Sequence, residues 1–244
     1  MNPGNAFITG ASKRIGRAIA ETLVADGWRV AIHAREADEE AKAAAKALHA
    51  PLLTADLADE RQVRPLFGQA VTALGGAITL LVNNASAFEH DDLGKATRAS
   101  WDLHMEANLR APFVLMQEFA NQPDAAGVVI NLLDQRVWNL TTEFVSYTVS
   151  KTGLWTLTQT MALAMAPRIR VMGIGPGPVM PSKHQTDAQF AAQAAATPLG
   201  IPAALGDIAG AVRFILATPS LTGQMIALDG GQHLQPFKRP KLDQ

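Results

Sequence analysis

The sequence predicts one α/β domain built on a parallel sheet with helices on both faces. Three observations support this prediction. Seven short apolar runs alternate with helical patterns along the whole chain, as in successive strand–helix–strand units. The run Ile78–Val82 is apolar almost throughout, as in a strand that is covered on both faces. No linker or repeat divides the chain, so we treat residues 1–244 as a single domain.

The composition excludes several classes of function. The chain is 48% hydrophobic and 18% charged with a net charge of −1, which is typical of a globular protein with a large core. No basic patch is visible, so we expect neither a nucleic-acid nor a membrane-surface partner. The absence of cysteine excludes disulfides and thiolate metal sites. The chain begins without a signal-peptide pattern, and no apolar run approaches the ~20 residues that span a bilayer. We therefore expect a cytoplasmic protein.

Hydrophobic periodicity and stop signals give the expected elements in order. Strands are expected over 6–8, 28–32, 52–55, 78–82, 127–133, 170–174 and 224–228. Helices are expected from 15 to a stop signal at Gly27, and over 37–49, 59–74, 100–120, 145–166 and 208–217. The helix over 59–74 ends at Gly75-Gly76 and accommodates Pro65 only near its first turn.

The first strand runs directly into the turn Thr9-Gly10-Ala11-Ser12-Lys13-Arg14-Ile15-Gly16. A strand, a glycine-bearing turn and a helix form the context in which pyrophosphate binds at a helix N-terminus. Gly10 permits a tight turn and Gly16 permits close approach of the backbone. The spacing is not Gly-x-Gly-x-x-Gly, because Arg14 stands where a related pattern has a glycine. An ordinary strand–helix turn is the alternative, but Lys13 and Arg14 add cations where an anion would bind.

The end of the second strand, His33-Ala34-Arg35, indicates which nicotinamide cofactor the chain uses. An acidic residue there would bind the ribose hydroxyls and repel a 2′-phosphate, whereas an arginine accommodates the phosphate. Arg35 and His33, with Lys13 opposite, therefore predict NADP(H). The acids between Glu36 and Glu40 are interpreted as favourable charges in the first turn of the next helix.

Polar residues also follow the third and fourth strands. Asp56 either accepts a hydrogen bond from the adenine amino group or, like Asp59, caps the next helix. Asn83-Asn84-Ala85-Ser86 lies at the carboxyl end of a buried strand, where open α/β sheets bind ligands. Phe88, two residues further on, either stacks on a flat ligand or packs beneath the loop.

Tyr147 and Lys151 lie four residues apart in an expected helix and therefore share one of its faces. Tyr147 is the only tyrosine in the chain. An ammonium near the phenol favours the phenolate and lowers a pKa that is ordinarily about 10. We therefore expect Tyr147 to exchange protons near neutral pH, as acid–base catalysis requires. Asp134, at the end of the fifth strand, is either a partner of Tyr147 or a turn residue without a chemical role.

Other segments give weaker signals. Asn108 is either a satisfied core amide or a group that holds water near Lys151. The run Gly175-Pro176-Gly177-Pro178 is expected to end the sixth strand. The Ala- and Gln-rich segment 178–200 is expected to form a flexible lid. The tail 233–244 is either disordered or crosses a subunit boundary. The histidines His90, His104, His184 and His233 lack metal-ligand spacing, so no metal site is predicted.

The ordered motifs resemble the short-chain dehydrogenase/reductase family over nearly the whole chain. They are the first turn, Asn83-Asn84-Ala85, Tyr147-x-x-x-Lys151, Pro176-Gly177 and Asp229-Gly230-Gly231. The resemblance implies a Rossmann-type, doubly wound sheet of seven strands. It also implies a dimer or tetramer built on the helices near 100–120 and 145–166. Asp134, where most members have serine, and Arg14, where most have glycine, are similar to the pteridine reductase branch, including bacterial dihydromonapterin reductases. That branch also has a phenylalanine at the spacing of Phe88.

The resemblance implies that NADPH delivers a hydride to a C=N or C=O carbon while Tyr147 supplies a proton. Lys151 would bind the nicotinamide ribose, and Asn108 would hold a water that relays protons to Lys151. Asp134 would bond Tyr147 or the amino group and ring nitrogen of a pterin. The candidate catalytic residues are Tyr147, Lys151, Asp134 and Asn108, and the candidate substrate residues are Phe88, Asp134 and Arg14. The candidate cofactor residues are Gly10, Ser12, Lys13, Arg14, Ile15, Gly16, His33, Arg35, Asp56, Leu57, Asn84, Ala85, Ser86, Tyr147, Lys151, Pro176, Gly177 and Val179.

The predicted function is thus NADPH-dependent reduction of a small, pterin-like molecule. One alternative is reduction of a ketone, such as a sugar or a keto-acyl chain, by a member of the same family. A more remote alternative is a non-enzymatic regulator that binds NADP. Loss of Tyr147 or Lys151 would have favoured the regulator, and both residues are present.

Overall fold

A computed structural model describes residues 2–182 and 185–235 of the chain. Seven parallel strands form one sheet in the order β3-β2-β1-β4-β5-β6-β7. The strands are β1 (Asn5–Ile8), β2 (Arg29–Ala34), β3 (Leu52–Thr54), β4 (Leu80–Asn83), β5 (Gly127–Leu132), β6 (Ile169–Pro176) and β7 (Met225–Leu228). The predicted α/β class and seven-stranded parallel sheet are confirmed.

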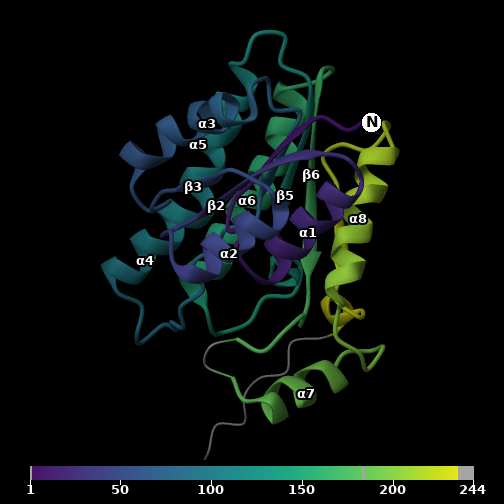
Figure 1. Ribbon diagram of the computed structural model, residues 1–244. Coiled ribbons are helices and arrows are strands. Elements are labelled where there is room, and N and C mark those ends of the chain that lie inside the picture. The colour runs from purple at the N-terminus through teal and green to yellow at the C-terminus, as the bar shows by residue number, and fades with distance from the viewer. Residues whose placement is uncertain (1, 183–184, 236–244) are drawn as a thin grey trace, which may run out of the picture.

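Helices cover both faces of the sheet (Figure 1). One face carries α1 (Arg14–Ala25), α2 (Glu39–Leu48) and α8 (Leu205–Ala217), and the other carries α3 (Glu60–Leu74), α5 (Ala111–Ala120) and α6 (Val145–Ala164). Because successive strand residues point to opposite faces, Ile8 joins the first core and Phe7 the second. Phe7 packs edge-on against Phe67 of α3, with ring centres 6.4 Å apart. The central strands β4 and β5 are buried at every residue and thus covered on both sides, as the apolar run 78–82 predicts.

The order of the strands reverses between β1 and β4. From β1 the chain steps outward through β2 and β3, and from β4 it steps the other way to β7. Ligands of open α/β sheets bind at the carboxyl edge beside such a switch point. Thr9 and Gly10 follow β1, and Asn84 follows β4. The switch point thus places the first turn beside the Asn-Asn motif.

The expected helix over 100–120 is observed as one helical run with three consecutive parts. They are α4 (Arg98–Met105), a π-helical turn (Glu106–Arg110) and α5. Pro112 has no N–H, so the carbonyl of Asn108, four residues earlier, loses its α-helical donor. A wider π turn directly before α5 accommodates this break. The predicted long helix is therefore confirmed, and Pro112 explains the π turn inside it, which the prediction did not include.

Three other expectations need correction or completion. The sixth strand does not end before Gly175, because Gly175 and Pro176 still pair with Ala227 and Leu228 of β7. Pro65 is the sixth residue of α3 rather than part of its first turn. The expected lid over 178–200 contains α7 (Asp187–Ala195), whose first turn is capped by the Thr186 side chain. His184 of the lid, and most of the tail 233–244, lie outside the described residues.

Candidate active site

The first turn is held against the end of β4 by side chains of both segments. The Asn84 side-chain nitrogen donates to the carbonyls of Thr9 and Gly10, each at 2.9 Å. In return, the Thr9 hydroxyl accepts the backbone N–H groups of Asn84 and Ala85, each at 3.0 Å. The approach is so close that a Cβ on Gly16 would lie under 3.0 Å from both Asn84 and the Gly10 carbonyl. Only glycine fits at position 16 without movement of the turn.

His33 holds the first turn through a hydrogen bond and is not one of the cations predicted to favour NADP(H). The imidazole is 2% exposed, and its Nδ1 accepts the backbone N–H of Gly10 at 3.2 Å. Its Nε2 lies 3.0 Å from the Ala55 carbonyl and donates to it when Nδ1 is the acceptor. Burial lowers the pKa of His33, so the ring stays neutral. The prediction that His33 helps to neutralise a 2′-phosphate was wrong, because a strand covered on both faces buries the ring.

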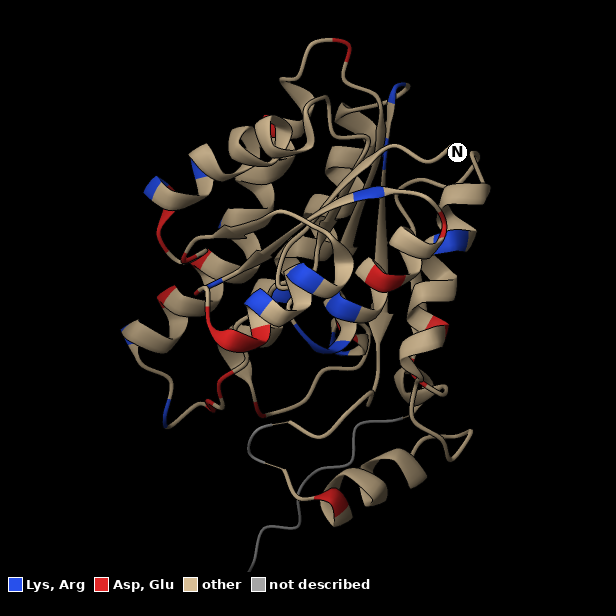
Figure 2. Cartoon of the chain, viewed as in Figure 1, with Lys and Arg blue, Asp and Glu red and all other residues tan. Residues whose placement is uncertain are grey.

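The remaining predicted cations lie at the surface beside the turn. Arg35 is exposed and approaches Glu36 at 3.7 Å, while Lys13 pairs with Glu40 at 3.2 Å. Figure 2 colours the Lys and Arg positions of the ribbon blue, and several lie on α1 and α2. Lys13, the N-cap residue of α1, makes no side-chain hydrogen bond to the first turn, so the N–H groups of this turn lack a side-chain cap. The turn therefore combines an open helix N-terminus with exposed positive charge.

Arg14 has a second role that its sequence position does not suggest. Its φ of 52° lies in the left-handed region, which explains why a glycine is usual at this place. Its guanidinium donates to the carbonyls of Pro181 at 2.8 Å and Met180 at 3.2 Å. Arg14 thus joins the first turn to the start of the lid.

The other predicted cofactor residues lie along the same carboxyl edge. Asp56 is exposed and its carboxylate accepts the Ala58 N–H, whereas the Asp59 side chain caps α3. The alternative in which Asp56 caps the helix is therefore wrong. Buried residues of this set are Leu57 and Pro176, partly buried ones are Ser12, Ile15, Ala85, Gly177 and Val179, and Ser86 is exposed.

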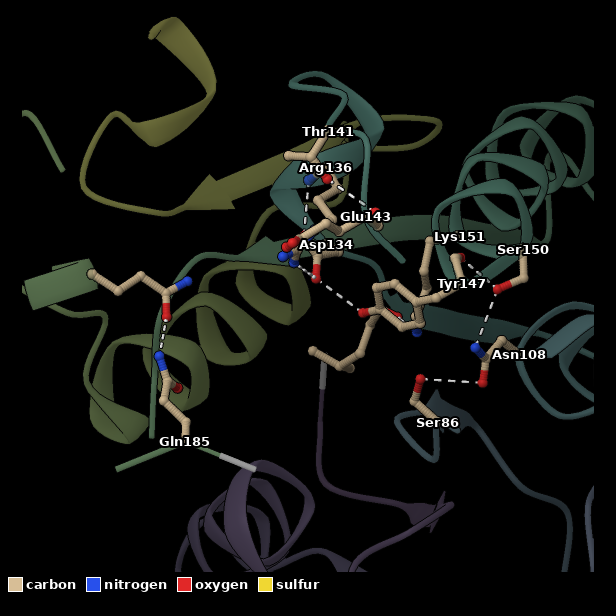
Figure 3. Close-up of polar contacts among 12 residues, drawn as sticks. Ser86, Asn108, Asp134, Arg136, Thr141, Glu143, Tyr147, Ser150, Lys151 and Gln185 are labelled. Atoms are coloured by element: carbon tan, nitrogen blue, oxygen red, sulfur yellow. Dashed lines mark hydrogen bonds and ion pairs between the residues drawn. The ribbon is translucent and has the colours of Figure 1, made fainter. Parts of the chain in front are cut away.

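Tyr147, Asp134 and Lys151 meet at the ends of β5 and α6 (Figure 3). The Tyr147 hydroxyl donates to Asp134 Oδ2 at 2.9 Å. Lys151 Nζ lies 5.8 Å from the centre of the Tyr147 ring and donates to the Leu132 carbonyl at 2.7 Å. Both Tyr147 and Lys151 are buried, with 6% and 2% of their surfaces exposed. The structure therefore brings together the three residues that the sequence singles out.

The pKa of Tyr147 shifts in the direction opposite to the prediction. Burial and the Asp134 carboxylate raise the pKa of Tyr147 well above its usual value, and the Arg136 charge offsets this only in part. Burial lowers the pKa of Lys151 to about 8. The prediction of a lowered phenol pKa was wrong because it counted the ammonium but neither the burial nor the nearer carboxylate.

Asn108 is a satisfied buried amide. Its Oδ1 accepts the Ala87 N–H at 2.7 Å and the Ser86 hydroxyl at 3.1 Å. Its Nδ2 donates to the Ala87 carbonyl at 3.0 Å and to Ser150 at 3.1 Å. These four bonds use the full capacity of the amide, so the side chain cannot also hold a relay water. The Asn108 side chain is therefore the satisfied core amide, which was the first of the two alternatives predicted from the sequence.

Two aromatic residues and one cation complete this region, and the sequence identified only one of them. Phe88 is stacked on Phe144, with ring centres 4.5 Å apart and planes at 6°. Phe88 also meets Tyr147 edge-on at 4.7 Å. The Arg136 guanidinium lies 5.0 Å from the Phe144 ring centre and 5.9 Å from that of Phe88. Phe144 covers one face of Phe88, so a flat ligand could stack only on the other.

A buried polar cluster that sequence reasoning missed fixes the start of α6. Asp91 accepts the backbone N–H and the hydroxyl of Ser146. His104 Nδ1 lies 2.7 Å from the Ser146 hydroxyl. The backbone N–H of Phe144 donates to the Asp91 carbonyl at 2.6 Å. Asp91 thus caps α6 at Ser146, one residue before Tyr147, although it lies in a loop far away in the sequence. No local sequence spacing predicts such a contact.

These features fit a dinucleotide bound at the carboxyl edge. Gly10, whose φ is 63°, and Gly16 let the first turn pack closely against the end of β4, and α1 begins directly after this turn. Arg35 and Lys13 would lie beside the adenosine ribose, and Lys151 beside the other end. Among residues 2–182 and 185–235 no cluster of His, Asp and Glu could hold a metal ion. Within the same ranges, no helix has the length and apolar character needed to cross a bilayer.

Comparisons with known proteins place this geometry in a family. A family model described as enoyl-(acyl carrier protein) reductase matches residues 10–233. The chain is 31% identical to L-xylulose reductase of Bos taurus over 93% of this chain and 95% of the other. It is 42% identical to the structure of FolM alternative dihydrofolate reductase 1 from Brucella canis complexed with NADP, with a TM-score of 0.92 over 99% and 98% of the two chains. A blue fluorescent protein from a metagenomic library, in complex with NADPH, is 33% identical with a TM-score of 0.87 over 95% and 98%.

The chain belongs to the short-chain dehydrogenase/reductase family. It is an oxidoreductase of that family, which uses nicotinamide cofactors. The predicted cofactor, NADP(H), is the one bound in both of the similar structures described above. The family and the cofactor class predicted from the first turn and the Tyr147 helix are therefore confirmed.

Proposed function

We propose that this protein is an NADPH-dependent reductase that reduces a C=N bond of a pterin-like substrate. The observation that carries the proposal is the 2.9 Å hydrogen bond from the Tyr147 hydroxyl to the Asp134 carboxylate. Similarity to the alternative dihydrofolate reductase of Brucella canis supports the same substrate class.

The chemistry of Asp134 favours a pterin over a ketone. A ketone gains negative charge on oxygen during reduction and needs hydrogen-bond donors around that oxygen. An ionised carboxylate only accepts hydrogen bonds and would repel the charge. A pterin instead presents an amino group and ring N–H groups, which donate to a carboxylate. Asp134 is therefore matched to a substrate with donors on its edge.

The residues have distinct proposed roles. When bound, NADPH supplies the hydride. Tyr147 supplies the proton to the other end of the reduced bond, and Asp134 orients the hydroxyl that carries it. Lys151 would exchange its bond to the Leu132 carbonyl for the nicotinamide ribose hydroxyls. Arg35 and Lys13 would bind the 2′-phosphate, and Phe88 would stack on the substrate ring through the face that Phe144 leaves open.

Asn108 enters the proposed proton path through its main chain. Its side chain is fully bonded, but Pro112 leaves its carbonyl without the usual helical donor. That carbonyl can accept a water, which would connect Lys151 to solvent. The role predicted for the side chain thus passes to the backbone of the same residue.

Steady-state oxidation of NADPH tests the proposal. Dihydrobiopterin or dihydrofolate should be turned over faster than a panel of ketones. Asp134→Ser should lose pterin turnover and gain ketone turnover, because a hydroxyl can donate to a carbonyl oxygen. Tyr147→Phe should abolish turnover while NADPH binding is retained. Faster turnover of ketones than of pterins by the wild-type protein would reject the pterin assignment.

The alternative substrate class is a ketone of a sugar or a keto-acyl chain. Similarity to bovine L-xylulose reductase favours this reading. The same panel of substrates separates the two, because only the ketone reading predicts that Asp134→Ser leaves the ranking of substrates unchanged.

We further propose that the protein is a cytoplasmic homo-oligomer, a dimer or tetramer, that buries the outer faces of α5 and α6. A hollow of about 500 Å³ between these helices is lined by Met105, Glu106, Leu109, Arg110, Phe113, Gly153, Thr156 and Leu157. Leu163, further along α6, is 82% exposed. Exposed apolar surface of this kind is typical of an interface between subunits.

A further inference from the structure

Arg136 is a largely buried arginine directly beside the candidate catalytic residue Asp134. It lies in a short 3-10 turn (Gln135–Val137) directly after Asp134, and its side chain is 17% exposed. Its guanidinium rests against the stacked rings of Phe88 and Phe144 (Figure 3 labels Arg136 beside Asp134). Nothing in the roles assigned above uses this cation.

The guanidinium has donors that the protein does not use. Its one polar contact among residues 2–182 and 185–235 is between Nη1 and Asp134 Oδ2, at a long 3.5 Å. Its Nε is buried and has no acceptor within the same ranges. By contrast, Arg170 donates three bonds of 2.9–3.1 Å to carbonyls, and Arg213 makes a paired contact with Asp26. A guanidinium whose N–H groups lack acceptors is costly to bury, so a bound acceptor for the terminal N–H groups would stabilise this arrangement.

Asp134 and Arg136 together present acceptors next to donors. The Asp134 carboxylate offers about four lone-pair sites, of which Tyr147 and Arg136 occupy three. The lactam edge of a pterin carries an amino group and a ring N–H, which donate, followed by a carbonyl oxygen, which accepts. A carboxylate beside a guanidinium is complementary to that sequence of groups.

We propose that Arg136 determines substrate specificity by donating to the lactam oxygen of the pterin, while Asp134 accepts from the amino end of the same edge. The inference rests on the proposed function and adds that the lactam edge of the pterin is the group that the protein recognises. It also explains why the cation is held against two aromatic rings and makes only one long contact with an acid, Asp134. Contact with both rings restricts the guanidinium, so less side-chain freedom is lost when it donates to a bound ligand.

The test compares two ligands that differ at the recognised atom. A pterin has oxygen at position 4 of the ring, and a 2,4-diaminopteridine has an amino group there, which donates and would meet Arg136 unfavourably. Wild-type protein should bind the pterin more tightly. Arg136→Met should raise the KM for dihydropterin and the inhibition constant of the pterin roughly 10- to 100-fold, with a smaller effect on kcat. The inhibition constant of the diamino compound should stay the same or fall.

Matched variants separate recognition from structure. Arg98→Met removes an exposed arginine of α4 that pairs with Asp102, and it should leave both inhibition constants unchanged. Arg136→Lys keeps the positive charge but loses the paired N–H donors of the guanidinium. Compared with Arg136→Met, it should recover part of the preference for the pterin over the diamino compound. If Arg136→Met melts at a lower temperature, Arg136→Lys and Arg136→Gln, compared at a temperature where both are folded, still report the ratio of the two constants.

The outcomes also separate this inference from the proposed function. Equal weakening of both ligands by Arg136→Met would mean that the arginine only supports the aromatic stack, and no weakening would mean that it is not in contact. In both cases pterin turnover by wild-type protein would still stand. Wild-type protein that neither binds nor reduces pterins would overturn the proposed function and this inference together.

Discussion

Replacement of Gly16 by alanine tests whether the first turn is as closely packed as the structure indicates. The added Cβ would lie under 3.0 Å from the Asn84 side-chain nitrogen and the Gly10 carbonyl oxygen. Neither atom can retreat freely, because Asn84 donates to Thr9 and Gly10, and Gly10 donates to His33. Overpacking of this kind destabilises by about 1–3 kcal/mol. Alanine regains about 0.5–1 kcal/mol in a helix, which leaves a net loss of up to about 2.5 kcal/mol.

Gly68→Ala is the matched control. Gly68 lies on the exposed side of α3, and no atom stands within 4 Å of the position that its Cβ would occupy. This variant should gain about 0.5–1 kcal/mol from helix propensity alone. At about 2–4 °C per kcal/mol for a chain of this length, Gly68→Ala should melt about 1–4 °C higher than wild type and Gly16→Ala up to about 10 °C lower.

The assay is thermal unfolding at one fixed protein concentration, followed by titration with NADPH. Gly16→Ala should bind NADPH more weakly, because relief of the clash moves the turn that faces the cofactor, whereas Gly68→Ala should bind it normally. The reasoning is refuted if both variants melt at or above the wild-type temperature with unchanged NADPH affinity.

Other parts of the site lead to four further predictions. Arg35→Ala should weaken NADPH binding far more than NADH binding in fluorescence titrations, because only NADPH carries the 2′-phosphate, and equal losses would reject the role of Arg35. The free energy of unfolding of the wild-type protein should rise between about pH 8 and pH ~10. In this range Lys151 is protonated in the unfolded chain but has lost its proton in the folded protein, where its pKa is about 8. The urea midpoint of Lys151→Met should not show this rise. Pro112→Ala supplies an N–H to the Asn108 carbonyl and should slow turnover without changing NADPH affinity, whereas unchanged turnover would exclude a water at that carbonyl. Leu163→Asp places a charge on the exposed face of α6 and should lower the mass measured by light scattering, and an unchanged mass would place the interface elsewhere.

The sequence predicted the elements and their order because strands and helices leave periodic patterns. It also placed Tyr147 and Lys151 on one face, since that depends only on a spacing of four residues. The sign of the Tyr147 pKa shift could not be read in this way. It depends on burial and on the 2.9 Å approach of Asp134, which only the packing of α6 against the end of β5 determines.

Two other residues show where local reading fails. The position of His33 near a strand end, beside Arg35, suggested a surface cation. Its strand is covered on both faces, and a fully buried imidazole is more stable when neutral. Arg136 gave no sequence signal at all, because its environment is made by Phe88 and Phe144 from two other segments. The burial of His33 follows from a covered strand and could have been predicted, whereas the role of Arg136 required coordinates.

The charges around Tyr147 favour reduction over oxidation. A reductase needs the phenol protonated at the start, whereas oxidation of an alcohol needs the phenolate as base. Burial and the Asp134 carboxylate raise the pKa of Tyr147 and so keep the proton on the hydroxyl. A serine in place of Asp134 would remove the like charge and make the phenolate easier to form. The Asp134 carboxylate therefore has two effects: it accepts hydrogen bonds from a pterin, and it keeps Tyr147 protonated for reduction. Both effects should be lost together in Asp134→Ser.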